Sequence, residues 1–243
     1  MVSSLFNTVI HDPLYNALVF LIGSVPYFDV GIAVVILTLF VKLILFPLAK
    51  KAIHTQVALK RITPRLEEAK KKYKDNQQEQ VKKTLEIYKE NDIHPLSGIL
   101  TLFVQLPVIL GLYWVFLRGG LPTIDPSTLY SFVPIPESVN MNFLGLVDMG
   151  GKSVLLAFLA GITQFIHARI AIHPPEVKTK PGESLKDDLA RSMSLQMRYV
   201  LPIFVGVISY FISSAIALYW TTSNLFTIGQ ELFVRRRIRD TQK

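Results

Sequence analysis

Cysteine is absent from this 243-residue sequence. Its absence excludes disulfide bonds, thiolate metal sites and attachment of a lipid through cysteine. Charged residues make up only 18% of the chain, and the first ten residues contain no lysine or arginine. The lack of early basic residues argues against an ordinary cleavable signal peptide, so we expect the mature protein to begin at or near Met1.

Long apolar runs dominate what is present. Half of the residues are hydrophobic and the mean hydropathy is +0.37, which is too apolar for an ordinary soluble domain of this length. Runs of about 20 apolar residues are long enough to cross a bilayer. We therefore expect an all-α polytopic membrane protein with five transmembrane helices. An amphipathic interfacial helix near 13–25 and a cytoplasmic helical hairpin complete the predicted fold.

The expected boundaries follow these runs, and Ser213-Ser214-Ala215 is the predicted turn between the last two spans. The predicted parts, in chain order, are the external amino terminus with the interfacial helix (1–28), span one (29–49), the cytoplasmic hairpin (50–95), span two (96–117), an external loop (118–151), span three (152–172), a cytoplasmic loop (173–198), span four (199–214), span five (216–234) and a basic cytoplasmic tail (235–243).

Lysine and arginine are unevenly distributed over the polar segments. Segments 50–95, 169–198 and 235–243 hold 23 of the 26, whereas the opposite side holds only Arg118 and Lys152. By the positive-inside rule, this places the amino terminus outside and the carboxyl terminus in the cytoplasm. The net charge of +8 is thus mainly a topological signal. Binding of the basic surface to ribosomal RNA or anionic lipid is the weaker interpretation.

The largest polar segment, 50–95, has two thin apolar stripes at helical spacing. Thr63-Pro64 suits a helix start, and Asp75-Asn76 suits a turn. The stripes consist of Leu66, Ala69 and Tyr73 before that turn and of Val81, Leu85 and Tyr88 after it. We favour a charged antiparallel helical hairpin, and a disordered basic loop is the alternative.

Patterns typical of covalent chemistry are weak throughout the chain. Segment 145–153 resembles a phosphate-binding loop, but it has one residue too many and follows no predicted strand. His167 and His173 lack acidic or cysteine partners at zinc-binding spacing. Neither a Ser/His/Asp set nor an intramembrane carboxylate pair is visible. We expect no enzyme activity, no metal and no cofactor.

Lys42 is the only charged residue in the apolar run 30–48. A charge near the middle of a span costs about 2.5–3.5 kcal/mol on insertion scales. The next charges, Lys50 and Lys51, suit the water boundary, which places Lys42 about 12 Å inside a hydrocarbon core about 30 Å thick. Such an expensive charge indicates a function.

Other spans carry polar residues that would lie near the depth of Lys42. Thr38 precedes Lys42 by four residues and so shares its helix face. Gln105 lies about 14 Å from the cytoplasmic end of span two, and Asn224 lies about 16 Å from Arg235. Trp220, Asn224 and Thr227 share one face of the last span, whereas Thr163, Gln164 and His167 would lie nearer the inner surface in span three.

Each of these residues also has a structural explanation, which the sequence leaves open. Polar side chains hydrogen-bond between packed transmembrane helices, and Trp220 suits an interfacial belt. Lys42 could extend toward the interface, but a side chain of roughly 6 Å does not cover about 12 Å unaided. We favour a hydrated cavity, because the convergence of Lys42, Gln105 and Asn224 at one depth would solvate a cation that has no intramembrane carboxylate.

Four segments form an ordered pattern. They are 41–48, with Lys42 and a closing Pro-Leu; 62–73, in the hairpin; 88–98 with 105–107 and 112–114, at the entry and body of span two; and 218–225, Leu-Tyr-Trp-Thr-Thr-Ser-Asn-Leu. Together they resemble the YidC/Oxa/Alb family of membrane protein insertases, over residues from about 13 to 236. The chain resembles a minimal five-span bacterial form.

Three features depart from the family pattern. Lys42 stands where the family usually has arginine, which keeps the charge but loses the planar five-donor fork. His94-Pro95-Leu96 replaces Asn-Pro-Leu, and Ile99-Leu100-Thr101 replaces the following Cys-Leu-Pro. We also expect neither the extra amino-terminal span and large external domain of some bacterial members nor the lipoprotein cysteine of others.

The resemblance implies a groove that is open to the cytoplasm and to lipid and closed toward the outside, in a bacterial cytoplasmic (inner) membrane. Client transmembrane segments would pass through it into the bilayer. The implied groove residues are Lys42, Thr38, Gln105, Trp220, Asn224 and Tyr219, and the implied client or ribosome contacts are Arg61, Arg65, Lys70, Lys71 and Lys72. Expected partners are nascent membrane proteins, lipids, the ribosome and a Sec-type translocon, and not DNA.

Two other function classes remain open at this point. A partly hydrated bundle also suits a small-solute transporter or channel, although no internal repeat or pair of discontinuous helices is visible. A structural scaffold for other membrane complexes is the second alternative.

Overall fold

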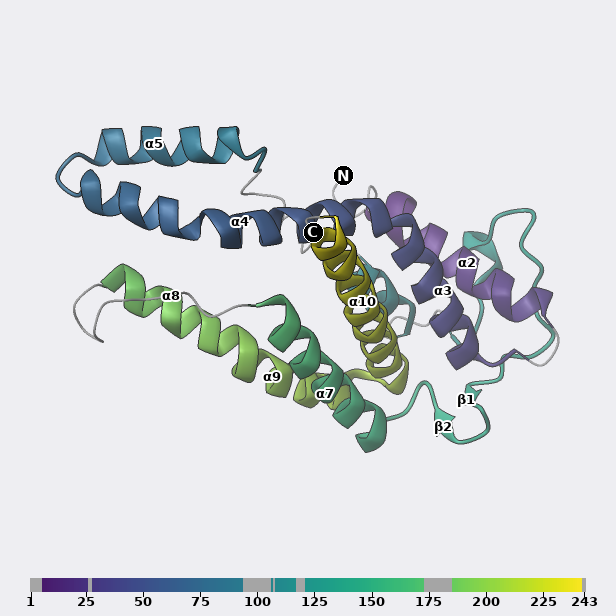
Figure 1. The fold of residues 1–243 in the computed structure, drawn as a ribbon. Helices are drawn as coiled ribbons and strands as arrows, with labels where there is room; N and C mark the ends of the chain where they lie inside the picture. The colour runs from purple at the N-terminus through teal and green to yellow at the C-terminus, as the bar shows by residue number, and fades with distance from the viewer. Residues whose placement is uncertain are drawn as a thin grey trace. The chain divides into compact units, whose positions relative to one another are not determined.

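The computed structural model describes residues 6–25, 28–93, 106, 108–116, 121–172 and 185–241, without the side chains of 185–188 and 190. The chain divides into two compact units. The first unit comprises Met1–Ile44 with Pro107–Gly229, and the second comprises Leu45–Leu106 with Gln230–Lys243. The described residues are mostly helical, as predicted, and Figure 1 shows one small β-hairpin beside the helices.

The first unit contains the apolar helices. Its elements are the π-helical segment η1 (Asn7–His11), α2 (Asp12–Ser24), α3 (Val30–Ile44), α7 (Val154–Ala171), α8 (Leu185–Leu195), the π-helical segment η3 (Gln196–Val200), α9 (Leu201–Ile212) and the part of α10 (Ser214–Asp240) up to Gly229. A 3₁₀ turn, η2 (Pro126–Thr128), and strands β1 (Asn142–Phe143) and β2 (Val147–Asp148) lie between α3 and α7. Residues 106 and 108–116 are also helical, and residue 107 lies outside the described residues.

Local signals explain where several of these helices begin. Pro13 occupies the first turn of α2, and the Ser153 hydroxyl caps α7 by accepting from the Leu156 amide at 3.3 Å. Between α9 and α10, Ser213 is extended, so the break lies in the segment where the sequence predicts a turn. The two strands pair antiparallel, with Asn142 opposite Asp148 and Phe143 opposite Val147.

Helix α2 packs on α3 and also holds the segment that follows residue 120. Leu18 and Val19 are fully buried in the core of the first unit, with Val30 and Val34 of α3. Asn16 donates to the Thr128 carbonyl at 2.9 Å and accepts from the Tyr130 amide at 2.7 Å. Asn16, which interrupts the apolar run in the sequence, therefore satisfies backbone groups that would otherwise lack hydrogen-bond partners.

Helices α7 and α9 approach closely through glycine. A Cβ added to Gly161 would lie 3.3 Å from the Pro202 carbonyl oxygen and 3.4 Å from the Gly206 Cα. Small residues at such a crossing let two apolar helices reach van der Waals contact without help from the hydrophobic effect, which is weak in lipid.

Two helical stretches, Val154–Ala171 and Arg191–Ile212, are long and apolar enough to cross a membrane. A third results if α3 and α4 (Phe46–Lys72) form one span broken at Leu45. Most of the predicted span two lies outside the described residues. In α10, the Thr-Thr-Ser-Asn run lowers the mean hydropathy. The count of five spans and the interfacial location of α2 thus stay predictions.

The second unit contains α4 and α5 (Gln77–Glu90), which Figure 1 shows side by side. The Asn76 side chain caps α5 by accepting from the Glu79 amide at 3.1 Å. Ile62, Ala69, Ile87 and Ile93 form a small buried cluster between the helices. At the other end of α4, Ile53 packs with Val234 and Ile238, and Arg235 pairs with Glu231 at 2.8 Å, so α10 stays helical through most of the basic tail.

Two details predicted for this hairpin are wrong. The helix does not start at Thr63-Pro64, because α4 runs through Pro64. Ile62 and Ala69 flank that proline and are both buried, and their packing outweighs the hydrogen bond that proline removes. The second apolar stripe is also misplaced, since Val81 and Leu85 are more than half exposed and Ile87 is buried in their place.

The glycine contact between α7 and α9 gives a test of the fold. Gly161→Leu should destabilise the protein by about 1–3 kcal/mol, because the added side chain overpacks the crossing. Gly229→Leu is the matched control, because a Cβ there meets nothing within 4 Å. Thermal unfolding in one detergent would compare both with the parent. Equal midpoints for the two variants would contradict a close crossing at Gly161.

Candidate functional site

Lys42 lies three residues before the break at Leu45 and faces a polar partner. Its side chain is half-buried, and its Nζ donates to the Thr227 Oγ1 of α10 at 3.1 Å. The same threonine hydroxyl donates to the Ser223 carbonyl at 2.8 Å. Because its proton is used within α10, the Thr227 oxygen presents lone pairs to the ammonium group.

A second polar contact lies one helical turn from Thr227. Asn224 donates from Nδ2 to the Thr163 Oγ1 of α7 at 3.3 Å, and both side chains are buried. Thr163 in turn donates to the Leu159 carbonyl at 2.8 Å. Asn224 and Thr227 are three residues apart on one face of α10, so this face links α3 on one side and α7 on the other.

His167 adds a third polar group from α7, one turn after Thr163. His167 Nδ1 is buried and has no hydrogen-bond partner among the described residues. We define the polar seam as Lys42, Thr163, His167, Asn224 and Thr227, all of which belong to the first unit.

The remaining predicted groove residues are placed differently. Thr38 is buried, but its hydroxyl donates to the Val34 carbonyl at 2.6 Å within its own helix. Tyr219 is almost fully buried and its hydroxyl hydrogen-bonds with Ser223, whereas Trp220 is half-buried. Gln105 lies outside the described residues.

Sequence reasoning did not include three members of the polar seam in the predicted site, namely Thr163, His167 and Thr227. Their signals were nonetheless visible as helical spacing. Thr227 follows Asn224 by three residues, and His167 follows Thr163 by four. Spacing gives the face of a helix, but the rotation of α7 toward Lys42 depends on packing.

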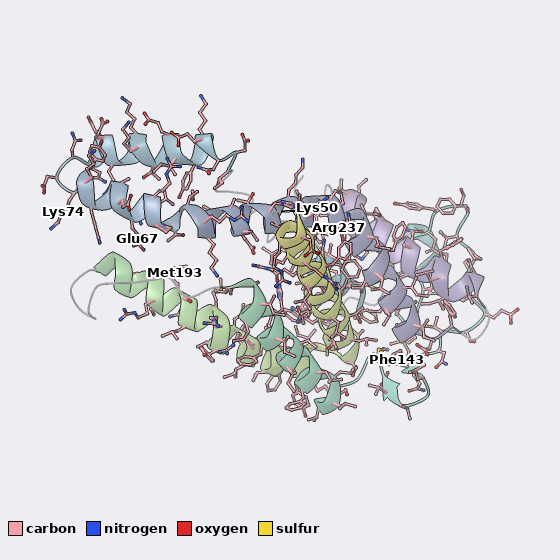
Figure 2. All side chains as sticks on the ribbon, viewed as in Figure 1. Lys50, Glu67, Lys74, Phe143, Met193 and Arg237 are labelled. Atoms are coloured by element: carbon pink, nitrogen blue, oxygen red, sulfur yellow. The ribbon has the colours of Figure 1, made fainter. Side chains whose placement is uncertain are left out.

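The predicted contact residues of the hairpin lie on α4. Arg61, Lys70, Lys71 and Lys72 are exposed, and Figure 2 shows long side chains projecting from both helices. Arg65 is also exposed, but it pairs with Glu90 of α5 at 2.9 Å. On α5, a hydrogen bond from Lys83 at 2.7 Å lowers the pKa of the Glu86 carboxyl and raises the pKa of the lysine. Among these five cations of α4, Arg65 is the one that forms an ion pair within the described residues.

Groups of three or more His, Cys, Asp or Glu side chains that could hold a metal ion are absent from the described part of the chain. The seam consists of hydroxyls, one amide, one imidazole and one ammonium. These groups can donate and accept hydrogen bonds, but they contain no arrangement typical of a nucleophile and its base.

Comparison with known proteins identifies the family. The profile described as "60Kd inner membrane protein" matches residues 21–242, nearly the whole chain. The chain belongs to this family. Among its relatives in the 60Kd inner membrane protein family, a protein of Oceanobacillus iheyensis is 31% identical over 211 residues, covering 85% of this chain and 74% of the relative.

Two further relatives cover similar ranges. One from Fusobacterium nucleatum is 30% identical over 230 residues, covering 94% of this chain and 98% of its own. One from Clostridium tetani is 29% identical over 211 residues, covering 87% and 84%. All three carry the name "Membrane protein insertase YidC". Membership confirms the resemblance seen in the four motifs and makes this chain a multi-pass membrane protein.

The Asn224–Thr163 contact should be measurable as a coupling energy. In a double-mutant cycle of Asn224→Leu and Thr163→Val, the coupling should be about 0.6 kcal/mol, which is typical of hydrogen bonds between transmembrane helices. Thr221→Val is the matched control, because its buried hydroxyl donates to Ala217 of its own helix. Reversible unfolding in bicelles would supply the values. A coupling energy between Asn224 and Thr221 as large as that between Asn224 and Thr163 would contradict a direct contact between Asn224 and Thr163.

Proposed function

We propose that this protein is a membrane protein insertase, which takes client transmembrane segments from the cytoplasm into the bilayer. The observation that carries the proposal is the polar seam, where a cation of an otherwise apolar helix meets hydroxyl and amide groups of α7 and α10. The relatives named as membrane protein insertases support the same function.

In this proposal the seam is the wall of a hydrated groove that is open to lipid. Lys42 keeps water in the groove and attracts the short polar or acidic outer segment of a client. Thr38, Gln105, Tyr219, Trp220 and Asn224 line the groove. Asn224 and Thr227, which each form one hydrogen bond between helices, at 3.3 and 3.1 Å, would exchange it for a hydrogen bond to the client.

The driving force is the burial of the client's own helix. Roughly 20 apolar residues leave water for lipid, and that transfer is favourable without a nucleotide or covalent chemistry. The insertase lowers the barrier for the client's polar end, which would otherwise cross the hydrocarbon core without hydrogen-bond partners.

The proposed topology has five spans, with the amino terminus outside and the carboxyl terminus in the cytoplasm of a bacterial inner membrane. The α4–α5 hairpin would then meet clients or the ribosome, and lipids and a Sec-type translocon are the other proposed partners. The uneven distribution of lysine and arginine in the sequence supports this orientation.

Lys42 gives the decisive experiment. Lys42→Leu should reduce insertion of a single-span client with an acidic tail at least about tenfold, since a lost hydrogen bond to a charged group contributes about 1.5–3 kcal/mol. Lys42→Arg should keep activity, and Lys51→Leu, which removes an exposed lysine of α4, is the control. Protease protection of the client in reconstituted vesicles is the measurement.

Several outcomes would overturn the proposal. Unchanged insertion in Lys42→Leu would remove the cation from the mechanism. Solute or ion flux without client insertion would favour a transporter or channel. Wild-type insertion when every seam residue is made apolar would favour a scaffold.

The hairpin predicts a separate effect on ribosomes. Neutralising Arg61, Lys70, Lys71 and Lys72 to glutamine should weaken binding of ribosomes carrying a nascent client and flatten its salt dependence, because fewer phosphate contacts release fewer counterions. The control changes Lys82 and Lys89 of α5, and it is compared with the double change of Lys70 and Lys71 so that both sets remove the same charge. Co-sedimentation over a salt series would measure both, and equal losses for the two sets would contradict a specific surface on α4.

A further inference from the structure

The tip of the β1–β2 hairpin has an unusual composition for a tight turn. Leu144 and Gly145 have φ angles of +52° and +73°, and the Leu146 amide donates to the Phe143 carbonyl at 2.9 Å. The strand register leaves Leu144, Gly145 and Leu146 as a three-residue loop, and a positive φ at a residue other than glycine is uncommon. Leucine in this region brings its Cβ too close to the carbonyl oxygen. The conformation therefore carries an energetic cost that asparagine offsets better, because its short polar side chain can hydrogen-bond locally.

Both leucines at this tip are largely exposed. Leu144 is 63% exposed and Leu146 is 84% exposed. If these side chains were exposed to water, no burial energy would offset the cost of the strained backbone. In an apolar environment their burial would offset it, because leucine is among the side chains that gain most from leaving water.

Residues at the start of α3 hold the hairpin tip at one end of the apolar helices. The Asp29 carboxylate accepts from the Ile32 amide at 2.7 Å and from the Leu144 amide at 2.9 Å, so one side chain caps α3 and holds the tip. Phe143 packs so tightly on Gly31 that no Cβ would fit there. Figure 2 shows Phe143 beside the first turn of α3.

The other strand is tied to α7 and α10. The Ala215 amide donates to the Met149 carbonyl at 3.1 Å, and the Ser214 amide donates to the Gly151 carbonyl at 2.8 Å. Two residues later, Ser153 caps α7. The hairpin therefore lies at the level where α3, α7 and α10 all begin, as Figure 1 also shows.

At that level the first turns of α7 present apolar side chains, while Asp148 and Lys152 are exposed close to them in the chain. Val154, Leu155 and Phe158 in the first turns of α7 are each more than 60% exposed, which is typical of a helix face that meets lipid. The tip, residues 143–146, contains no charged side chain. Its exposed leucines thus form a second apolar surface at the end of the helices where α7 begins.

We propose that the tip, Leu144-Gly145-Leu146, inserts into the hydrocarbon edge of the leaflet at this end of the spans. Through Asp29, the inserted tip holds the first turn of α3 at a fixed depth. The proposal rests on α7 crossing the membrane. It does not depend on insertase activity or on which side of the membrane the amino terminus lies.

The absence of cysteine makes a direct test possible. Leu146→Cys would carry a nitroxide spin label in vesicles, and its collisions with lipid-soluble oxygen and with a water-soluble nickel complex would be measured. Phe158→Cys is the lipid-exposed reference and Glu137→Cys, in the same inter-helix segment, is the aqueous one. The oxygen-to-nickel ratio at position 146 should resemble that at 158 and exceed that at 137 severalfold.

Two other results would overturn the proposal. A ratio like that of position 137 would place the tip in water. Protection from both reagents would show that protein covers the tip, either a second copy or another partner.

A turn variant separates lipid contact from simple folding. Leu144→Asn improves the turn but removes half of the apolar tip, so in the Leu146→Cys background it should lower the ratio severalfold without lowering the unfolding temperature in detergent. Leu144→Met, which keeps an apolar side chain, is the matched control. An unchanged ratio in Leu144→Asn would contradict anchoring by the leucine side chains.

Discussion

The hydrogen bond between Lys42 and Thr227 is the contact on which the proposed function depends. An ammonium group in an apolar helix is costly unless other groups solvate it, and the cost determines what the neighbouring helices must carry. Here α10 supplies a hydroxyl whose own proton is already used within the helix. One turn away, Asn224 extends the same face to Thr163 of α7. The polar face of α10 thus meets two neighbouring helices, the cation of α3 through Thr227 and the hydroxyl of Thr163 through Asn224.

Around this seam, the first unit uses two different means of holding apolar helices together. Where α7 and α9 cross, glycine allows close van der Waals contact. Where the chain leaves the helices, buried polar side chains satisfy irregular backbone, as Asn16 does for residues 128 and 130 and Asp29 does for 32 and 144. The second unit has the pattern typical of helices in water, with a thin apolar cluster between α4 and α5 and charged outer faces.

Several features were predictable because they depend on short-range rules. Helical periodicity and the four ordered motifs predict a helical membrane protein of the right family, and the break at Ser213 lies within the predicted turn. Errors arose where packing overrode a local preference. Pro64 lies inside α4 because Ile62 and Ala69 are buried on either side of it, and the apolar stripe of α5 centres on Ile87 because α4 covers that face and leaves Val81 and Leu85 exposed.

The sequence by itself determined the class of the protein, its family and the presence of an expensive cation at Lys42, since composition, hydropathy and motif order require no coordinates. It also placed Asn224 and Thr227 on one helix face, because a helix has a fixed period. Only the tertiary structure decided which groups meet. The rotation of each helix about its axis depends on the summed packing of many side chains, so neither the pairing of Lys42 with Thr227 nor that of Asn224 with Thr163 follows from spacing. The strained leucine at the hairpin tip was equally hidden, because its φ angle is set by the register of two short strands held by Asp29.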